Sequence, residues 1–307
     1  LGDVYKRQVN ILASTDAGTH SIDIIDVNEV TMDQIAADAG KGLLLATAPN
    51  AIKFTANERE QSLFYVKYNL KDEVLGTGMT EWKLDGFEIV PVEPDNPDNP
   101  DIKPTTSVDT ILSANALNYH TWRTENDKLL QRMGELRHNG EEEQGAWFRV
   151  KGSKISRDSK FGFENKYTAY ELGYDQVTKR TADKTRYQGV GLSYTDGSSS
   201  YSRGSGDNSS KSIGFYNTDI GSKGHYLDLV FKISNMDNDF TVYDTNSNKI
   251  TGDFNNTGVA LSAEYGRKND LQNGWYIEPQ AQFTLGYLGG DNYTASNGIN
   301  IDPVSYT

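Results

Sequence analysis

The chain has 307 residues, a formal net charge of −13 and no cysteine, and it contains 29 glycines and 18 tyrosines although only 36% of its residues are hydrophobic. This composition favours many short strands and turns over a helical bundle. The lack of cysteine excludes a disulfide framework and thiolate metal sites, and the acidic charge argues against nucleic acid or an anionic membrane surface as a partner.

Both ends of the chain are interpreted as sequencing-adapter artefacts. Residues 1–8 include DVYKRQ, which a transposon end used as a sequencing adapter encodes in one frame, and residues 304–307, VSYT, resemble its reverse complement. We therefore expect an internal fragment, without a visible signal peptide. No run of about 18 apolar residues occurs, so no transmembrane helix is expected, whereas the alternating strands of a membrane barrel do not produce such runs.

Residues 9–92 consist of short β segments separated by polar turns, with partial period-two alternation at Ile22, Ile24 and Val27. Strands of about four to six residues at intervals of about ten to twenty favour a small β-solenoid or a sandwich. The order NIL, THSIDIID, GLLLATA, FYVKYNL and TEWKL resembles the membrane-proximal end of a pertactin-like autotransporter passenger. That resemblance implies a β-solenoid segment with an autochaperone-like role and carries no catalytic motif.

Residues 93–105 are expected to form a linker. The stretch from Pro91 to Pro104 contains five of the eight prolines, so neither helix nor sheet can continue through it. Proline-dense sequence favours an extended, semi-rigid form that holds two domains apart. Its aspartates do not have the spacing of a calcium loop, so we interpret the stretch as a solvated spacer.

A long helix is predicted over residues 106–140. Ser107 or Thr106 is the expected N-cap, Asp109 lies in the first turn, and Gly140 ends the helix. Residues spaced alternately by four and three share one face: Val108, Leu112, Asn115, Tyr119, Trp122, Asn126, Leu129, Met133 and Leu136. The helix alone favours an exposed coiled-coil segment, but the strands that follow it favour a helix inside a pore.

Residues 141–303 are assigned to a barrel, because from Gly145 onward the strands alternate strictly over about nine to eleven residues, the length of a tilted transmembrane strand. The residues expected to face lipid are Leu227, Leu229, Phe231, Trp275, Ile277 and Phe283. Those expected to face an aqueous lumen are Arg149, Asp228, Lys232, Glu264 and Glu278. A soluble sandwich or a lipocalin-like barrel is the alternative. Charged polar faces, aromatic residues near strand ends, and a long turn, SYTDGSSSYSRGSGDNSS, that alternates with a short one, GRKNDLQNG, favour the membrane barrel.

The series RMGELR, GAWFRVKGSK, YELGYD, GVGLSYTDG, GHYLDLVFK, SAEYGRK, NGWYIEPQAQ and GDNYTASNGI resembles the translocator domain of type V (type Va) autotransporters, in the same order and from Ser107 to Asp302. The resemblance implies an all-β fold: a transmembrane antiparallel up-and-down β-barrel of twelve strands around a pore helix, preceded by the β-solenoid segment. About eight or nine of the twelve strands are expected within this chain.

The resemblance also implies a function and partners. It implies an outer-membrane translocator that exports and anchors its own N-terminal passenger, an adhesin-like β-helix, at the cell surface. Its expected partners are the outer-membrane lipid bilayer, the barrel-assembly machinery, periplasmic chaperones and the passenger, with a monomeric state and no cofactor. The alternative is the same translocator with a serine protease or esterase passenger upstream of Val9, and a third possibility is a pore or soluble β-protein without a role in secretion.

Motifs for catalysis and metal binding are missing from the sequence. None of the four histidines has metal-ligand spacing, no GxSxG or HExxH motif occurs, and GSGDN at 204–208 is expected to be an exposed loop. Some relatives cleave themselves at an asparagine pair before the RMG motif, but Asp127 and Lys128 occupy those positions here. Cyclisation at Asn126 and Asp127, assisted by a lumen acid such as Glu264 or Glu278, is the remaining chemical candidate. The sequence therefore predicts no enzyme and no metal site.

Overall fold

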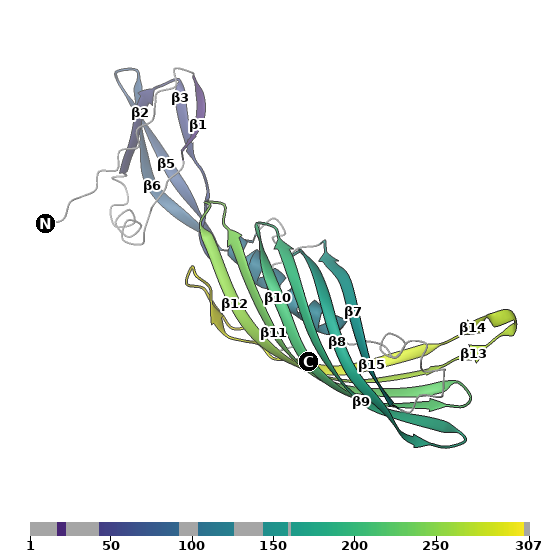
Figure 1. The fold of residues 1–307 in the computed structure, drawn as a ribbon. Helices are drawn as coiled ribbons and strands as arrows, with labels where there is room; N and C mark the ends of the chain where they lie inside the picture. Colours follow the sequence, from purple (N-terminus) through teal and green to yellow (C-terminus); the bar gives the residue numbers. More distant parts are fainter. Residues whose placement is uncertain (1–16, 23–42, 92–103, 126–143, 159–160, 304–307) are drawn as a thin grey trace. The chain divides into compact units, whose positions relative to one another are not determined.

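The computed structural model describes residues 17–22, 43–91, 104–125, 144–158 and 161–303 (Figure 1). The chain forms two compact units, residues 1–108 with 244–247 and residues 109–243 with 248–307. Each unit is described by itself. None of the helices in the described residues is long and apolar enough to cross a membrane.

The described residues of the first unit form six strands: β1 (Gly18–Ile22), β2 (Leu43–Pro49), β3 (Ile52–Ala56), β4 (Arg59–Glu60), β5 (Phe64–Leu75) and β6 (Met79–Pro91). Strands β1 and β3 pair in parallel, as successive coils of a solenoid do, whereas β2, β6, β5 and β4 form an antiparallel sheet. The buried side chains of Val66, Tyr68 and Leu84 form its core. Within the described residues, parallel pairing is thus confined to β1 and β3. The segment VNIL lies outside them.

Helix α2 (Thr106–Thr124) begins one residue after its N-cap. The backbone N–H of Val108 donates to Oγ1 of Thr105 at 3.3 Å, so Thr105 fills the capping position. The predicted N-cap, Ser107 or Thr106, is therefore wrong by one or two residues, because three hydroxyl residues follow one another and only backbone geometry distinguishes them. The predicted continuation to residue 140 lies outside the described residues.

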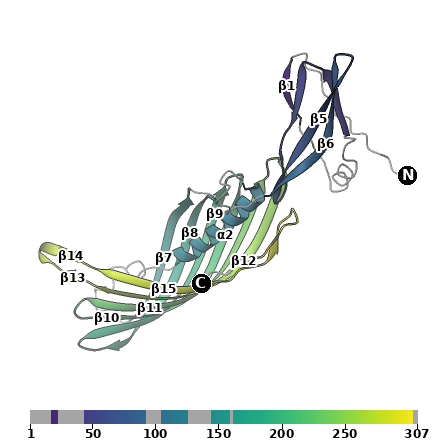
Figure 2. The same ribbon diagram turned by 180° about the vertical axis from the view of Figure 1, so that it is seen from behind.

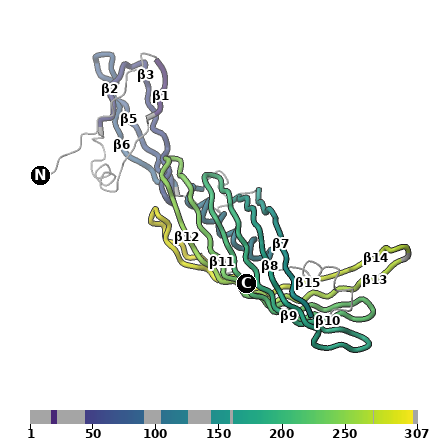
Figure 3. Tube along the Cα trace, in the orientation of Figure 1, coloured from purple at the N-terminus to yellow at the C-terminus, as the bar shows by residue number. Residues whose placement is uncertain are grey.

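The second unit is built on one antiparallel sheet of seven long strands. They are β7 (Gln144–Arg157), β8 (Phe163–Arg180), β9 (Lys184–Tyr201), β10 (Gly204–Gly221), β11 (His225–Tyr243), β12 (Lys249–Arg267) and β15 (Gln280–Leu288). Their order in the sheet follows the chain, and successive strands lie side by side in Figure 3. This order confirms the predicted all-β antiparallel up-and-down arrangement.

The remaining segments of the second unit form short elements. These are the pair β13 (Asn269–Asp270) and β14 (Tyr276–Ile277), the 3₁₀ turn η2 (Gln272–Gly274), and the pair β16 (Tyr293–Thr294) and β17 (Asn300–Ile301). Within the described residues, the sheet therefore has seven strands where the sequence predicts eight or nine. Six of the seven are 14 to 19 residues long, longer than predicted.

The predicted long turn SYTDGSSSYSRGSGDNSS is wrong. Strand β9 continues to Tyr201, β10 begins at Gly204, and only residues 202 and 203 separate them. The segment GSGDN at 204–208, expected to be an exposed loop, is the beginning of β10. Serine and glycine have a low intrinsic preference for strands, but pairing on both sides overrides it here: Ser199, for example, is paired with Gly206 of β10 and with Asn165 of β8.

Helix α2 lies on one face of this sheet, which we call the inner face (Figure 2). Ile111 and Ala114 pack in one cluster with Phe240 and Val242 of β11 and Phe254 of β12. The opposite face of the sheet, the outer face, carries the other half of each alternating strand. The two faces differ in chemistry, and that difference defines the site.

Candidate functional site

The outer face carries an apolar belt that crosses all seven strands. Its members are large apolar side chains that are each at least 39% exposed: Phe148, Val150, Tyr170, Leu172, Tyr174, Leu192, Tyr194, Phe215, Leu227, Leu229, Phe231, Ile233, Leu261, Tyr265, Phe283, Leu285 and Tyr287. One line of the sheet register runs through Phe148, Leu172, Leu192, Ile213, Ile233, Val259 and Tyr287. A contiguous exposed apolar surface of this extent marks contact with lipid or with another protein.

The belt has a limited height. On β11 it runs from Leu227 to Ile233, and the next outward residues are Asn235, Asp237 and Asp239. Seven residues span about 24 Å along a strand, and at a tilt of about 45° this length corresponds to a height of about 17 Å, within the apolar band of about 25 Å that outer-membrane barrels have. The polar ends of the strands therefore extend beyond the apolar region, as they would beyond a bilayer.

Of the six residues expected to face lipid, Leu227, Leu229, Phe231 and Phe283 lie in the apolar belt. Trp275 and Ile277 lie outside the seven-stranded sheet, because the chain folds back in the β13–β14 pair and β15 begins only at Gln280. Pro279 has no backbone N–H and contributes only its carbonyl, which accepts from the N–H of Arg267 at 3.1 Å. The predicted place of Trp275 and Ile277 on the lipid-facing side of a long barrel strand is therefore wrong.

The inner face is polar along most of its area. Its buried polar side chains on the long strands are Asn165, Glu171, Thr195, Ser199, Asn208, Ser210, Ser212, Thr218, Asp228, Ser234, Asn238, Asn256, Ser262 and Glu264. Glu171 pairs with Arg149 on the neighbouring strand, and Ser193 is hydrogen-bonded to Ser212. A surface of hydroxyl, amide and charged groups on the face opposite an apolar belt is the chemistry of an aqueous lumen.

Two carboxylates lie side by side on this inner face. Asp228 and Glu264 are direct cross-strand partners, and each is 2% exposed. The hydroxyl of Thr218 donates to Asp228 Oδ1 at 2.6 Å, and the hydroxyl of Tyr226 lies 2.8 Å from Glu264 Oε1. Each carboxylate thus has a hydroxyl partner, which offsets part of the cost of burying its charge.

Of the other three residues predicted to face the lumen, two lie on the inner face of the sheet and one lies outside the sheet. Arg149 and Lys232 lie on the inner face and are both partly buried. Glu278 lies between β14 and β15, outside the seven-stranded sheet, and is half-buried. Its predicted place on the strand wall is therefore wrong for the same reason as that of Ile277.

Helix α2 is seated on β11, β12 and β15 by close apolar contact. Trp122 packs with Met236, Ala260 and Leu288. Its ring lies so near Gly258 and Gly286 that a Cβ on either glycine would stand 2.4 Å or 2.3 Å from a ring atom. Only glycine leaves room for the indole at these two positions.

A chain of buried amides accompanies the apolar contact. Asn118 Nδ2 donates to Asn256 Oδ1 at 2.7 Å, and Asn238 Nδ2 donates to Asn118 Oδ1 at 3.1 Å. Both partners come from the sheet, one from β12 and one from β11. The helix is therefore fixed in register along its axis, because an axial shift would leave these amides unpaired.

The C-terminal end of the helix is held by two lysines from the sheet. Lys232 Nζ donates to the carbonyl oxygen of Glu125 at 2.9 Å, and Lys151 Nζ donates to the carbonyl oxygen of Thr124 at 3.2 Å. The hydroxyl of Ser234 donates to the Glu125 carboxylate at 2.6 Å. Positive charges at the last carbonyls of a helix complement its dipole.

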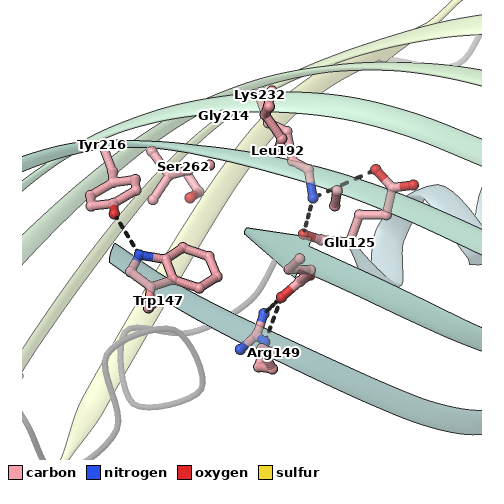
Figure 4. A pocket seen from close by; sticks show the side chains of 12 residues that line it. Glu125, Trp147, Arg149, Leu192, Gly214, Tyr216, Lys232 and Ser262 are labelled. Carbon is pink, nitrogen blue, oxygen red and sulfur yellow. Dashed lines mark hydrogen bonds and ion pairs between the residues drawn. The ribbon is translucent and has the colours of Figure 1, made fainter. Parts of the chain in front are cut away.

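Glu125 and Lys232 border a cavity on the inner face, together with Trp147, Arg149 and Tyr216 (Figure 4). Lys232 is directed toward Glu125, while Arg149 is paired with Glu171. The indole N–H of Trp147 donates to the hydroxyl of Tyr216 at 3.2 Å. Pairs of opposite charge therefore surround the point where the described helix ends.

The predicted pore-helix face is only partly the buried face. Trp122 is buried, but Asn115 and Tyr119 are half-buried, because the stripe nearest the sheet contains Ile111, Ala114 and Asn118 instead. Asn126, Leu129 and Met133 lie outside the described residues. The candidate cleavage residues Asn126 and Asp127 do too, so their geometry toward Glu264 is not described.

Several residues of this site have no counterpart in the sequence prediction. The sequence does not predict a role for Lys151, Ser234, Asn118 or the glycine pair Gly258 and Gly286. Their roles depend on which strands the helix lies against, and the alternation of a single strand contains no such information. Among the described residues, no group of three or more histidine, aspartate or glutamate side chains is arranged to hold a metal ion.

Comparisons with known proteins agree with this arrangement. The family model for the autotransporter beta-domain matches residues 146–307. The pertactin autotransporter of Bordetella parapertussis is 33% identical over 183 residues, which cover 59% of this chain and 20% of pertactin. The probable autotransporter YcgV of Escherichia coli is 34% identical over 192 residues, 60% of this chain and 19% of YcgV.

Among solved structures, the beta domain of the Bordetella autotransporter BrkA matches with 29% identity and a TM-score of 0.47, over 52% of this chain and 64% of that one. The chain spans about a fifth of the length of the curated relatives named above.

Proposed function

The chain belongs to the autotransporter family through its beta-domain, and from this premise we propose that its second unit is the outer-membrane translocator that exports and anchors the N-terminal part of the same protein. The observation that carries the proposal is the opposition of the two sheet faces. An apolar belt crosses the outer face, while hydroxyls, amides and paired charges line the inner face. Lipid fits the first surface and a hydrated polypeptide fits the second.

Helix α2 is the final piece of the exported chain in this proposal. It lies on the inner face, its contacts come from side chains on β7, β11, β12 and β15, and it connects in sequence to the first unit. In the finished state it anchors the passenger and fills part of the lumen. A polypeptide moving through the lumen would readily exchange one polar contact with the wall for another. The packing of Trp122 on Gly258 and Gly286 and the hydrogen bonds of Asn118 are specific to one position of the helix, so they define where export stops.

The first unit is proposed as the membrane-proximal end of an adhesin-like surface passenger. The parallel pair β1–β3 supports a solenoid that ends in the antiparallel sheet of β2, β4, β5 and β6. Folding of this unit outside the cell would draw the chain outward without ATP. An upstream protease or esterase passenger is the alternative, and the coding sequence upstream of Val9 distinguishes the two.

Further partners follow from the exposed belt. Before insertion into the membrane, a protein that exposes an apolar surface of this size would aggregate in water. We therefore propose periplasmic chaperones and the barrel-assembly machinery as partners, with the translocator acting as a monomer. As an alternative, the helix cleaves itself at the bond between Asn126 and Asp127. An intact bond in the mature surface protein, measured by mass spectrometry, would exclude this alternative.

A display experiment tests the proposed function. An epitope tag is placed directly upstream of Val9 in the protein expressed with its own upstream and downstream sequence. We expect the tag to be digested by protease added to intact cells, while a periplasmic marker stays protected. A tag that is protected in intact cells and digested only after lysis would contradict export by this domain.

A further inference from the structure

We propose that the turn between β11 and β12, residues 244–247, is a docking surface for the base of the passenger, and that Glu60 of β4 is the residue that this turn holds. The first unit is not one continuous stretch of chain, because it consists of residues 1–108 together with this turn. The inference rests on the proposed function, since it concerns how an exported segment completes its fold. It adds that the translocator supplies part of the structure of its own passenger.

Glu60 lies at the end of β4 and is only 2% exposed, so its carboxylate is buried. Its Oε2 accepts hydrogen bonds from the backbone N–H of Thr245 at 2.8 Å and from the hydroxyl of Thr106 at 3.2 Å. Its Oε1 accepts from the backbone N–H of Thr106. Burying a carboxylate is costly unless hydrogen-bond donors replace its water, and these donors lie 46 and 185 residues further along the chain. The buried position of Glu60 therefore depends on two distant segments.

The first of these segments is the start of helix α2. Thr106 is the first residue of the helix, and a carboxylate at a helix N-terminus is stabilised by the N–H groups of the first turn and by the helix dipole. Two further hydrogen bonds hold the same point. The hydroxyl of Thr105 donates to the carbonyl oxygen of Ser62 at 2.9 Å, and the hydroxyl of Tyr65 donates to the carbonyl oxygen of Pro104 at 3.1 Å. The helix start is thus fixed to the segment that contains β4 and β5.

The second segment is the turn between β11 and β12, whose shape is set by its own hydrogen bonds. Asp244 Oδ1 accepts from the backbone N–H of Asn246 at 2.8 Å, and the Asp244 carbonyl accepts from the N–H of Ser247 at 3.0 Å, as in a β-turn that begins with aspartate. Two other donors of this turn bind Glu60. The N–H of Thr245 donates to its carboxylate, and the side-chain amide of Asn246 donates to its carbonyl oxygen at 2.7 Å. The turn therefore contacts both the side chain and the backbone of one passenger residue.

These contacts couple the folding of the passenger base to the end of export. Thr105 and Thr106 are buried as fully as Glu60, and a buried donor or acceptor that loses its partner is destabilising. Before the helix start has left the lumen, Glu60 would lack the donors of Thr106, and β4 lies at the edge of its sheet, where it pairs with β5 alone. Docking on the turn is therefore the step that completes the first unit.

Two substitutions at Thr245 test the docking surface. Thr245 occupies the second position of the turn, where proline is favoured, so Thr245→Pro deletes the N–H that binds Glu60 and remains compatible with the turn. Thr245→Ala keeps this N–H and removes only an exposed side chain, which makes it the matched control. Hydrogen exchange of the purified full chain, folded in detergent and followed by mass spectrometry of its peptides, is measured for the parent and for both variants.

We expect amide exchange at the helix start, in the peptide that contains Thr106, to be at least about tenfold faster in Thr245→Pro than in the parent chain, because the buried carboxylate has lost a donor and the segment opens more often. Thr245→Ala should exchange at the parent rate. Exchange at the helix start that does not differ between the two variants would overturn the proposal.

A second variant approaches the same contact from another atom. If Thr245→Pro also accelerates exchange within β11 and β12, the turn itself is disturbed, and Asn246→Ala takes its place. This variant removes the side-chain donor to the Glu60 carbonyl and keeps every backbone N–H of the turn. We expect faster exchange at the helix start here too, and exchange at the parent rate would overturn the proposal.

Export and docking are then measured separately on intact cells. With the epitope tag upstream of Val9, Thr245→Pro should leave the tag as accessible as in the parent chain, while added trypsin should cleave after Arg59 of β4 faster than in Thr245→Ala, because β4 opens more often. A displayed tag with equal cleavage after Arg59 in the two variants would contradict the docking surface. A tag that stays protected in the parent chain would contradict the proposed function, while the exchange result in detergent would still decide whether the turn holds Glu60.

Discussion

Trp122 of helix α2 lies against Gly286 of β15 so closely that a Cβ at this glycine would stand 2.3 Å from the indole ring. We expect Gly286→Val to displace the ring and destabilise the seated helix by about 1–3 kcal/mol, the usual cost of overpacking. Urea unfolding in liposomes, followed by tryptophan fluorescence, measures the change. Gly152→Val is the control, because nothing lies near that position. If Gly286→Val costs as much stability in a Trp122→Ala background as in the parent chain, the contact is not the cause.

The lysine contacts at the helix end predict a second effect. Lys232→Met removes a hydrogen bond from a charged donor to the Glu125 carbonyl, an interaction worth about 1.5–3 kcal/mol. We expect the helix end to detach more often, so that open-channel events in planar bilayers become more frequent. Lys154→Met, on the exposed pair with Glu164, should have no effect. Identical open probability in the two variants would show that Lys232 does not hold the helix.

If the apolar belt lies in lipid, a charged side chain should destabilise the folded domain more within the belt than beyond it. Leu192→Arg places a guanidinium in the belt and should destabilise the folded domain in liposomes by about 2–4 kcal/mol. Ser200→Arg lies on the outer face of the same strand, beyond the belt, and should change stability little. Both are measured by urea unfolding and by the amount of folded protein in the outer membrane. Equal tolerance of the two substitutions would place Leu192 outside lipid.

The β5–β6 hairpin of the first unit predicts a pH effect. Glu73 and Glu81 are cross-strand partners, and Lys83 Nζ lies 2.8 Å and 3.2 Å from their carboxylates. The hydrogen bond from Lys83 lowers the pKa of Glu73. A group whose pKa is lower in the folded state stabilises above its unfolded pKa, and that stabilisation disappears as the pH falls through the folded pKa.

Lys83→Met should therefore reduce hydrogen-exchange protection of the hairpin amides near neutral pH, with a difference that shrinks in acid. In the Glu73→Gln, Glu81→Gln background the same substitution should show no such pH dependence. A difference from the parent chain that stays constant from neutral to acidic pH would contradict the role of Lys83.

The period-two pattern of single strands was sufficient to predict much of the fold. It correctly separated Leu227 and Leu229 from Asp228 on β11, because alternation in an antiparallel strand determines which face a side chain joins. The prediction failed where the intrinsic conformational preference of a segment differs from the structure that its neighbouring strands impose. The serine- and glycine-rich segment around Ser199 looks like a loop but is held in the sheet by strands on both sides.

The candidate site was harder to predict, because its contacts join distant segments. The spacing of Val108, Leu112, Asn115, Tyr119 and Trp122 suggested one helix face, but the sheet contacts the neighbouring stripe of Ile111, Ala114 and Asn118. Polar and apolar residues of the helix itself are mixed on all of its sides, so periodicity alone does not distinguish the two stripes. The contacts of Asn118 with Asn256 and Asn238, and the packing of Ile111 and Ala114 against β11 and β12, select the observed one.

The central claim is that the seven-stranded sheet spans a membrane with its apolar belt toward lipid and its polar face toward water. Spin labels on single cysteines at each position from Leu227 to Ser234, in the full chain reconstituted in liposomes, test it most directly. We predict that oxygen accessibility is high at Leu227, Leu229, Phe231 and Ile233 and low at the residues between them, and that a water-soluble nickel complex reaches the four belt positions poorly. Uniform accessibility along the strand, or high nickel accessibility at the belt positions, would contradict the claim.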